Sequence, residues 1–342
     1  MGYKLFQLPC PRYQGGPKHM SIVENAQSSM LTRKEAKPHL KRKDWPGLLY
    51  LSVHLSLVGG TGYLVSLSTN TTWIVPAILL HGFILSTLFH PLHECIHGTA
   101  FRTRWLNETV MQILGFIYIW PGLLFRYDHA PHHSYTQIKG KDTEMAIPTP
   151  RNLGDYLVYV SGLTHHWRNL GWLFRHSMGR MLPEDRAYVP ETEVHKIFLE
   201  ARIMLAGYVL IMAGGIVSGY WWVPVIYYFL PRFLGEPVVR FFRVAEHVGM
   251  EETPNEHSID MTRNTRTTLT NPLVQFLTWN MGFHGEHHVF PGAPFHQLPA
   301  LHERIGHNLY VAKGGYLWVH WNIIQNHLEG FSLQPARKIE AL

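Results

Sequence analysis

Histidine is the residue type with which this chain could carry out unusual chemistry. It occurs 24 times in 342 residues, and imidazole is the commonest metal ligand in proteins. Many of the histidines are clustered, first as His93-Glu-Cys-Ile-His97. Two further clusters share the spacing HxxHH, and they are His129-Ala-Pro-His132-His133 and His284-Gly-Glu-His287-His288. Helical residues at i, i+3 and i+4 lie on one face, so each cluster is expected to direct its imidazoles toward a common point.

The clustered histidines are too many for one metal ion. First-row metals take about four to six ligands and need open positions for chemistry, so eight imidazoles predict two metal ions. All-imidazole ligation with open positions suits iron, copper or zinc, and iron is the natural choice if oxygen is to be activated. His247, within Ala-Glu-His, is a ninth candidate ligand. Glu94 and Glu286 lie inside the clusters and are candidates to accept the second N–H of an imidazole.

The elements that carry these clusters are expected to be membrane helices. Charged residues make up only 16% of the chain, and none occurs from Trp45 to His93. That run has room for two helices of about 20 residues each, the length that crosses a bilayer. A second uncharged run extends from Ile203 to Pro231 and predicts a third span, with a fourth after it. The four expected spans are 47–67, 73–92, 199–220 and 222–244.

The Lys and Arg residues predict the orientation of the spans. Basic residues precede the first span, follow the second and fill 139–196, whereas the connection at 68–72 has none. The positive-inside rule then places both termini and the middle of the chain in the cytoplasm. The apolar segment 109–125 is too short to span easily and is expected to be interfacial or re-entrant.

The expected fold class is therefore an all-α membrane protein. Four transmembrane helices form two hairpins, and a cytosolic helical cap carries a di-metal histidine site. Along the chain we expect a cytoplasmic N-terminal segment, a membrane domain, and a cytoplasmic C-terminal tail. Their ranges are 1–44, 45–305 with the cap at 93–198 and 245–305, and 306–342.

The motifs resemble those of the integral-membrane fatty acid desaturase superfamily over roughly residues 45–305. The similar stretches are HECIHGTAF (93–101), FRYDHAPHHSYT (125–136) followed by Asp142 and Glu144, AEH (245–247), NTRTT (264–268) and WNMGFHGEHHVFPGAPFHQLPALH (279–302). The resemblance implies two iron ions at the membrane face, with O2 as co-substrate. Carried onto this chain, the implied ligands are His93, His97, His129, His132, His133, His247, His284, His287 and His288. It also implies that Asn280 approaches the iron through a water molecule.

The function implied by this resemblance is O2-dependent oxidation of unactivated C–H bonds in a lipid acyl chain, foremost desaturation. Hydroxylation, oxidative decarboxylation to a terminal alkene, and carotenoid oxygenation are alternatives on the same scaffold. Electrons are expected from a separate ferredoxin, rubredoxin, or cytochrome b5 with its reductase. We expect the protein to lie in a bacterial inner membrane, with its active site on the cytoplasmic face.

Other classes of protein fit the sequence less well. A net charge of +6 is not concentrated as in a nucleic-acid binder, so no nucleic-acid partner is expected. A metal transporter would place paired ligands in the middle of spans, where His54 and His81 are isolated. The first cluster has the HExxH form of zinc proteases, but such an enzyme has no use for two further HxxHH clusters. Two cysteines exclude a Cys-based zinc module.

Overall fold

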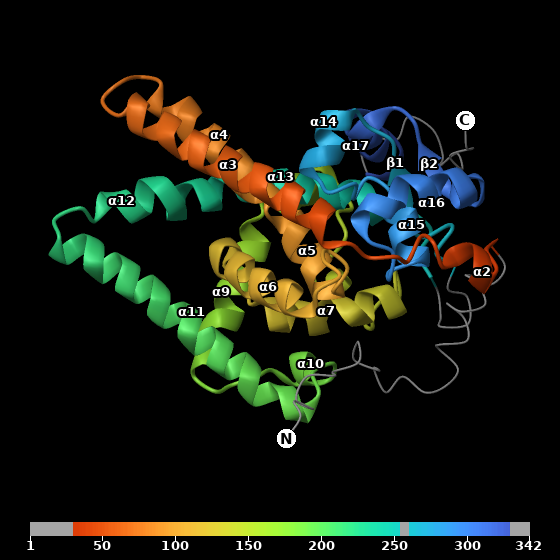
Figure 1. The fold of residues 1–342 in the computed structure, drawn as a ribbon, viewed down its shortest axis with the longest axis horizontal. Helices are drawn as coiled ribbons and strands as arrows, with labels where there is room; N and C mark the ends of the chain where they lie inside the picture. Colours follow the sequence, from red (N-terminus) through yellow and green to blue (C-terminus); the bar gives the residue numbers. More distant parts are fainter. Residues whose placement is uncertain (1–29, 254–259, 329–342) are drawn as a thin grey trace.

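The computed structural model describes residues 30–253 and 260–328, and helices form most of the regular structure within them (Figure 1). Two pairs of long helices project toward one side, and the shorter elements gather at the other. The projecting pairs and their continuations are α3 (Asp44–Ser68), α4 (Ile74–Thr87), α11 (Glu191–Val217), α12 (Trp222–Pro224), the π-helix η2 (Val225–Phe229) and α13 (Leu230–His247).

The shorter elements form a cap around the histidine clusters. The cap helices are α2 (Arg33–Ala36), α5 (Phe89–His97), α6 (Arg104–Tyr118), α7 (Gly122–Ser134), α8 (Leu153–Ser161), α9 (Leu163–Ser177), α10 (Pro183–Arg186), α14 (Pro272–Leu277), α15 (His284–Val289), α16 (Leu298–Ile305) and α17 (Gly315–His327), with 3₁₀ turns η1 (Thr143–Ala146), η4 (Phe295–Gln297) and η5 (Gly306–Asn308). A parallel two-stranded sheet, β1 (Arg266–Thr268) with β2 (Tyr310–Ala312), was not expected. Strands of three residues are too short to leave an alternating pattern in the sequence.

Three helical stretches of the described residues are long and apolar enough to cross a membrane. They contain α3, the continuous pair α4–α5, and α11, and thus coincide with the first three expected spans. The fourth expected span, 222–244, forms α12, η2 and most of α13 but does not have this composition. Its charged residues Arg232, Glu236 and Arg240 are at most 1% exposed and pair with one another inside the protein. The four-span topology therefore stays a prediction.

The segment expected to be interfacial or re-entrant contains a sharp bend. Helices α6 and α7 meet at 97° across a break at Ile119–Pro121, a geometry of a broken span or a re-entrant loop. Ile119 ends α6 in the left-handed conformation, at φ +57°, and Pro121 precedes the first residue of α7. Because a β-branched residue rarely adopts this conformation, packing around the bend must hold it.

Helices α4 and α13 cross so closely that only glycine fits at the contact. A Cβ atom on Gly235 would lie 2.2 Å from the carbonyl oxygen of Gly82, and one on Gly82 would lie 2.5 Å from the oxygen of Pro231. Small residues at such crossings let helix backbones approach in membranes. This crossing fixes α5, which continues α4, relative to the end of α13. Both of those helix ends carry clustered histidines.

The two isolated histidines of the spans bond to backbone carbonyl groups. Nε2 of His81 donates to the oxygen of Tyr227, which lies in the π-helix, at 3.0 Å. The ring of His54 has Nδ1 2.8 Å from the Tyr50 oxygen and Nε2 3.2 Å from the Leu277 oxygen. Each histidine thus links its helix to an element far along the chain, which is a structural role.

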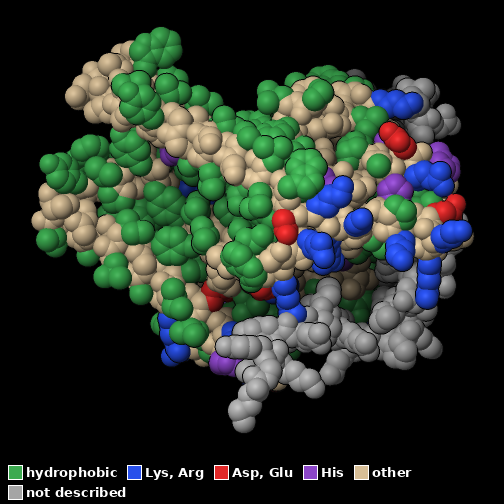
Figure 2. All heavy atoms as spheres, viewed as in Figure 1, with side chains coloured by type: hydrophobic (Ala, Val, Ile, Leu, Met, Phe, Trp, Pro, Cys, Tyr) green, Lys and Arg blue, Asp and Glu red, His purple; other side chains and the backbone are tan. Residues whose placement is uncertain are grey.

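The surface divides in the same way as the fold (Figure 2). Apolar side chains cover the side where α3, α4, α11 and α12 project, and Lys and Arg gather over the cap. Leu79, Leu210 and Val217, for example, are 51%, 71% and 89% exposed. Exposed aliphatic surface of this extent on long helices fits contact with lipid rather than water.

Candidate metal centre

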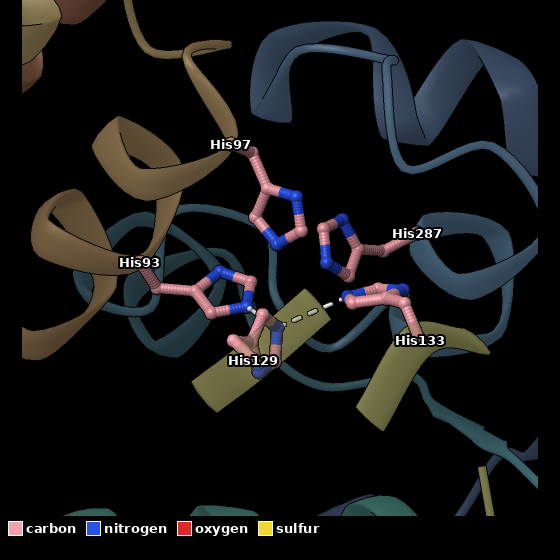
Figure 3. A group of neighbouring side chains, drawn as sticks. All are labelled: His93, His97, His129, His133 and His287. Atoms are coloured by element: carbon pink, nitrogen blue, oxygen red, sulfur yellow. Dashed lines mark hydrogen bonds between the residues drawn. The ribbon is translucent and has the colours of Figure 1, made fainter. Parts of the chain in front are cut away.

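The nine predicted histidines come together in two neighbouring groups. Within each group the candidate ligand atoms all lie within 4.8 Å of one another. The first group, shown in Figure 3, contains His93, His97, His129, His133 and His287. The second group contains His132, His247, His284 and His288. No residue of the predicted ligand set lies outside the two groups.

Each HxxHH cluster is divided between the groups, so the expectation that its imidazoles meet at one common point was wrong. On α7 the i and i+4 residues, His129 and His133, serve the first group, and the i+3 residue, His132, serves the second. On α15 the assignment is reversed, because His284 and His288 serve the second group and His287 the first. A helix turns roughly 100° per residue, so i+4 deviates from i by about 40° in one sense and i+3 by about 60° in the other. Two helices with this spacing can therefore bridge two adjacent sites.

The first and second groups also receive ligands from the ends of the long helices. Two of the three histidines of α5, His93 and His97, enter the first group, at the end of the α4–α5 stretch. His247, the last residue of α13, enters the second. The α4–α13 crossing therefore sets the distance between the α5 histidines of the first group and His247 of the second. Helices α7 and α15 of the cap close the site from the other side.

The nitrogen atoms converge as they would around a cation. Nε2 of His129 lies 2.9 Å from Nε2 of His93 and 3.0 Å from Nε2 of His133, and Nε2 of His284 lies 3.0 Å from Nε2 of His247. Several buried ring nitrogens have no hydrogen-bond partner in the described part of the chain, and these include both nitrogens of His287 and Nε2 of His288. Buried polar atoms without partners are costly, and a metal ion would satisfy the converging lone pairs. The donor set therefore fits two metal ions.

Burial keeps the ligands of α15 in the form that binds metal. It is the main cause that holds the pKa of His284, His287 and His288 well below the usual range, and the neighbouring imidazoles act in the same direction. These rings are therefore neutral at physiological pH. A neutral imidazole has the lone pair that metal ligation requires.

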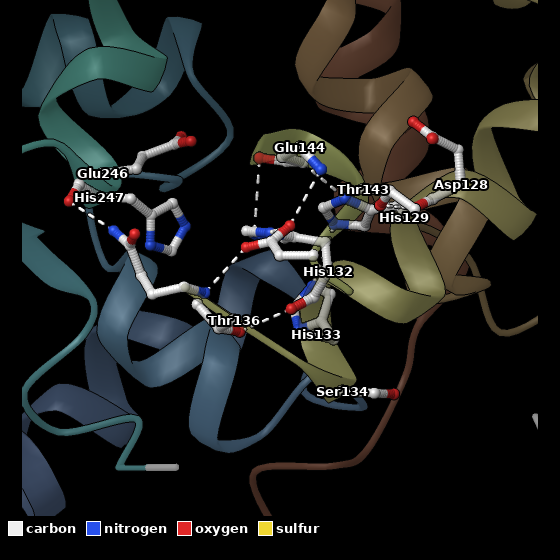
Figure 4. A network of polar contacts seen from close by, with 12 residues as sticks. Asp128, His129, His132, His133, Ser134, Thr136, Thr143, Glu144, Glu246 and His247 are labelled. Carbon is white, nitrogen blue, oxygen red and sulfur yellow. Dashed lines mark hydrogen bonds and ion pairs between the residues drawn. The ribbon is translucent and has the colours of Figure 1, made fainter. Parts of the chain in front are cut away.

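Two acidic residues orient the α7 histidines, and Figure 4 shows one of them, Glu144, beside His129 and His132. Nδ1 of His132 donates to Asp142 at 2.9 Å, and Nδ1 of His129 donates to Glu144 at 3.1 Å. These bonds leave Nε2 of each ring for its group, the usual arrangement of a carboxylate behind a ligating histidine. Glu144 is also ion-paired with Arg243, so its charge is already compensated. The sequence showed the two acids only as residues that follow the second cluster.

Backbone and hydroxyl groups orient two ligands of the second group. Nδ1 of His247 donates to the carbonyl oxygen of Asn264 at 3.1 Å, and Nδ1 of His288 lies 3.2 Å from the Thr136 hydroxyl. Arg266 donates to the oxygens of Ala245 and Val248, and so caps the end of α13 beside His247. Backbone acceptors leave no signal in a sequence, because every residue type has one.

The two glutamates inside the clusters have structural partners. Glu94 accepts from the Thr99 hydroxyl and from the Phe295 N–H, while its Oε1 lies 4.0 Å from Nδ1 of His93. Glu286 does accept from an imidazole, but from that of His302, which lies outside both groups. The hydrogen bond to Glu286 raises the pKa of His302. Glu286 also accepts from the Thr267 hydroxyl at 2.6 Å, and it therefore ties α15 to β1 and α16.

Asn280 lies just before α15 in a strained segment. It and Trp279 both have positive φ angles, +59° and +50°, although neither is glycine. The amide of Asn280 donates to the Phe295 oxygen at 3.1 Å, and Trp279 is fully buried. Such strain costs of order 1–3 kcal/mol per residue and is held by the surrounding packing, often near functional sites. A water-mediated approach of Asn280 to a metal stays a prediction.

Comparisons with known proteins relate the chain to a family of desaturases, in agreement with the histidine groups. The sequence model of a family described as fatty acid desaturase matches residues 70–320. A beta-carotene 4-ketolase of Haematococcus lacustris is 24% identical over 262 residues, which is 74% of this chain and 69% of that protein. A sphingolipid delta(4)-desaturase of Drosophila melanogaster is 25% identical over 249 residues, covering 70% and 68%. A fatty acid desaturase of Bacillus subtilis is 21% identical over 273 residues, covering 71% and 72%.

Proposed function

Because the chain belongs to the fatty acid desaturase family and is therefore an oxidoreductase of lipid metabolism, we propose that it removes hydrogen from an unactivated C–H bond of an acyl chain with O2 and two iron ions. The observation that carries the proposal is the division of nine histidines, most of them buried, into a group of five and a group of four. Fewer than six imidazoles per ion leave open positions where O2 and substrate can approach.

When bound, a pair of iron ions supplies the activation of O2 and the abstraction of hydrogen. The protein orients the histidine ligands and limits the access of water. Asp142 and Glu144 keep Nε2 of His132 and His129 directed at the two sites. Burial of most of these rings limits their contact with bulk water, and His129, His132 and His287 are at most 1% exposed. Exclusion of water protects a reactive site from side reactions.

The proposed substrate is an apolar, lipid-like chain delivered from the bilayer. The proposed electron donor is a separate ferredoxin, rubredoxin, or cytochrome b5 with its reductase. We place the histidine groups on the cytoplasmic face of the membrane, because Lys and Arg gather over the cap that contains them. Desaturation is the leading reaction, because several relatives are named as desaturases.

A second candidate is oxygenation of a carotenoid. The specific observation in its favour is the similarity to a beta-carotene 4-ketolase over three quarters of the chain. Both reactions begin with removal of hydrogen from a C–H bond, so the same histidine groups serve either. What differs is the shape of the substrate and where it lies against the metals, a matter of about an ångström.

The experiment is mass spectrometry of lipid extracts from cells that express the chain together with an electron donor. The control is the His132→Ala variant, which removes one ligand from the second group. A product lighter by two hydrogens, absent in the control, is expected for desaturation. A product heavier by oxygen would instead establish hydroxylation or ketone formation, and a terminal alkene one carbon shorter would establish decarboxylation. Identical lipid profiles from both chains, with fatty acids and beta-carotene supplied, would refute the proposal.

A further inference from the structure

Helix α9 of the cap has its apolar residues outside and its polar residues inside. Its four most exposed residues are all large and apolar, and together they form what we call the α9 stripe. They are Leu163, Trp167, Leu170 and Phe174, at 55%, 81%, 36% and 52% exposed. The polar residues His165, Asn169 and His176 of the same helix are buried, at most 6% exposed. A helix between a protein core and water shows the opposite arrangement.

Polar contacts with the cap fix the rotation of α9 about its own axis. Arg168 donates to the carboxylate of Asp128 on α7 at 2.8 Å, and its guanidinium carbon lies 4.1 Å from the centre of the Trp172 ring. The indole N–H of Trp172 donates to Asp185 on α10 at 3.0 Å. Residues three and four apart share a helix face, so the spacing of the α9 stripe keeps it together on a different face. The stripe therefore cannot turn inward unless these bonds break.

The apolar flank of α9 contacts α11 at the level of its uncharged stretch. Leu173 belongs to a buried cluster with Met204 and Tyr208 of α11, and α9 lies beside α11 in Figure 1. Both α11 residues fall in the uncharged run that begins at Ile203, within the helix that is long and apolar enough to cross a membrane. Ile203 is 61% exposed. Helix α9 thus lies at a level where α11 presents apolar side chains outward.

Near its start, α9 also contacts α13 through stacked rings. The ring of His166 lies nearly parallel to that of Phe233, with the ring centroids 4.3 Å apart, and Nε2 of His166 donates to the Phe233 backbone oxygen at 3.1 Å. Phe233 is itself 45% exposed. The α9 stripe therefore adjoins exposed apolar residues of both long helices. A water-soluble partner cannot cover the stripe without displacing lipid from its neighbours on α11, so lipid is the occupant that fits.

We propose that α9 is a membrane-embedded helix that lies along the surface of the bilayer, with the α9 stripe against phospholipid acyl chains. Its 15 residues are about 22 Å long, too short to cross a hydrocarbon core of about 30 Å. Amphipathic helices with Trp, Phe and Leu on one face lie in the interface plane, with that face about 5–10 Å deep. Part of the cap expected in the cytosol is then in the membrane. This holds whichever reaction the chain catalyses.

The embedded helix would also anchor the metal centre to the bilayer. Asp128, which pairs with Arg168 of α9, directly precedes His129 in α7. Helix α7 contributes three of the nine clustered histidines, and it has no apolar window of its own long enough to cross a membrane unless it is joined to α6. The Arg168–Asp128 pair therefore links a lipid-bound helix to an element that carries metal ligands.

The test measures whether lipid or water reaches the α9 stripe in the full chain. Trp167→Cys and Phe174→Cys each carry a bimane fluorophore, in a Cys10→Ser background in which Cys95 is buried. The labelled chain is reconstituted in phosphatidylcholine nanodiscs that hold one copy each, so a second copy cannot cover the stripe. Fluorescence loss is compared between a phospholipid with a nitroxide on its acyl chain and iodide in the water. The background chain without an introduced cysteine measures any labelling of Cys95.

Three labelled positions serve as controls. Leu210→Cys lies on α11 at a side chain that is 71% exposed and marks contact with lipid, and Glu184→Cys on α10 marks contact with water. Thr164→Cys is next to Leu163 in the chain but off the stripe, so lipid should quench it less than the stripe positions.

The proposal predicts that the nitroxide lipid quenches both stripe labels as strongly as the label at Leu210→Cys, and that iodide quenches them far less than the label at Glu184→Cys. Iodide quenching equal to that at Glu184→Cys would overturn the proposal, because water would then cover the stripe. Stripe labels that neither quencher reaches would also overturn it, because another part of the chain would cover them.

Discussion

The crossing of α4 and α13 makes the sharpest prediction about what positions the histidines. Replacement of Gly235 by Ala puts a Cβ atom 2.2 Å from the Gly82 oxygen and 2.8 Å from the Gly82 carbonyl carbon. Those are backbone atoms inside a helix and cannot rotate away. Carbon and oxygen atoms are in contact at about 3.5 Å, so the helices must separate by about 1 Å.

The steric loss of unfolding free energy can be isolated by comparison with a glycine whose Cβ position meets no other atom. Gly60 lies in α3, and a Cβ atom there meets nothing within 4 Å. Both substitutions gain the same helix propensity, up to about 1 kcal/mol, because both sites are helical. The difference in unfolding free energy between Gly235→Ala and Gly60→Ala is therefore the steric term alone. Overpacking of this kind costs about 1–3 kcal/mol.

The assay is denaturant unfolding of the two variants in detergent, with iron content measured on the same samples. Gly60→Ala should be as stable as the unmodified chain or slightly more stable, with full iron. Gly235→Ala should be less stable by about 1–3 kcal/mol than Gly60→Ala. It should also lose iron, since a shift of about 1 Å moves His247 relative to His93. Equal stability and equal iron in the two variants would refute the view that this crossing positions the site.

Three further predictions concern the surroundings of the ligands. Asp142→Asn should lower metal affinity about 10–100-fold, measured by chelator competition, because the charged acceptor behind His132 becomes a neutral amide. Arg266→Lys should reduce the unfolding free energy by about 1–3 kcal/mol, because one of the two carbonyl groups that Arg266 binds at the end of α13 is left without a donor. Metal retention should be flat from pH 7.5 to pH 6, because the lowered pKa of the α15 histidines means that protons compete only in more acidic solution.

Each of these predictions has a control or a contrary result. Asp155→Asn changes an exposed carboxylate at the start of α8 that accepts from the Arg151 N–H and the Asn152 amide, and it should leave metal affinity unaltered. Arg263→Lys alters an exposed ion pair with Glu251 and should cost little. A metal affinity that falls about tenfold between pH 7 and pH 6 would mean that the histidines titrate normally, contrary to their burial.

The metal ligands were predictable from the sequence because ligand chemistry restricts residue type. Eight of the nine histidines stand in clusters with helical spacing, and the structure gathers all nine in two groups. The division of each HxxHH cluster was not predictable, because the spacing is equally compatible with one shared site. The direction of α7 relative to α15 decides which residues pair, and that direction depends on packing between elements far apart in the chain.

The supporting contacts were less predictable for physical reasons. Asp142 and Glu144 were visible as acids near a cluster, but their distance to specific rings depends on the turn at η1. Glu286 was expected to serve a clustered histidine, and its partner is His302 because α16 packs against α15 there. The long apolar helix α11 was predictable from its uncharged run, whereas the fourth expected span stays a prediction, because Arg232 and Glu236 lie within it and pair with each other.

The central claim is that two histidine groups hold two iron ions, and iron stoichiometry tests it most directly. The purified chain would be loaded anaerobically with ferrous iron and compared with His97→Ala, from the first group, and His284→Ala, from the second. The account predicts about two iron ions per unmodified chain, in line with two ligand groups, and about one in each variant. A single iron ion in the unmodified chain, or an unchanged content in both variants, would contradict it.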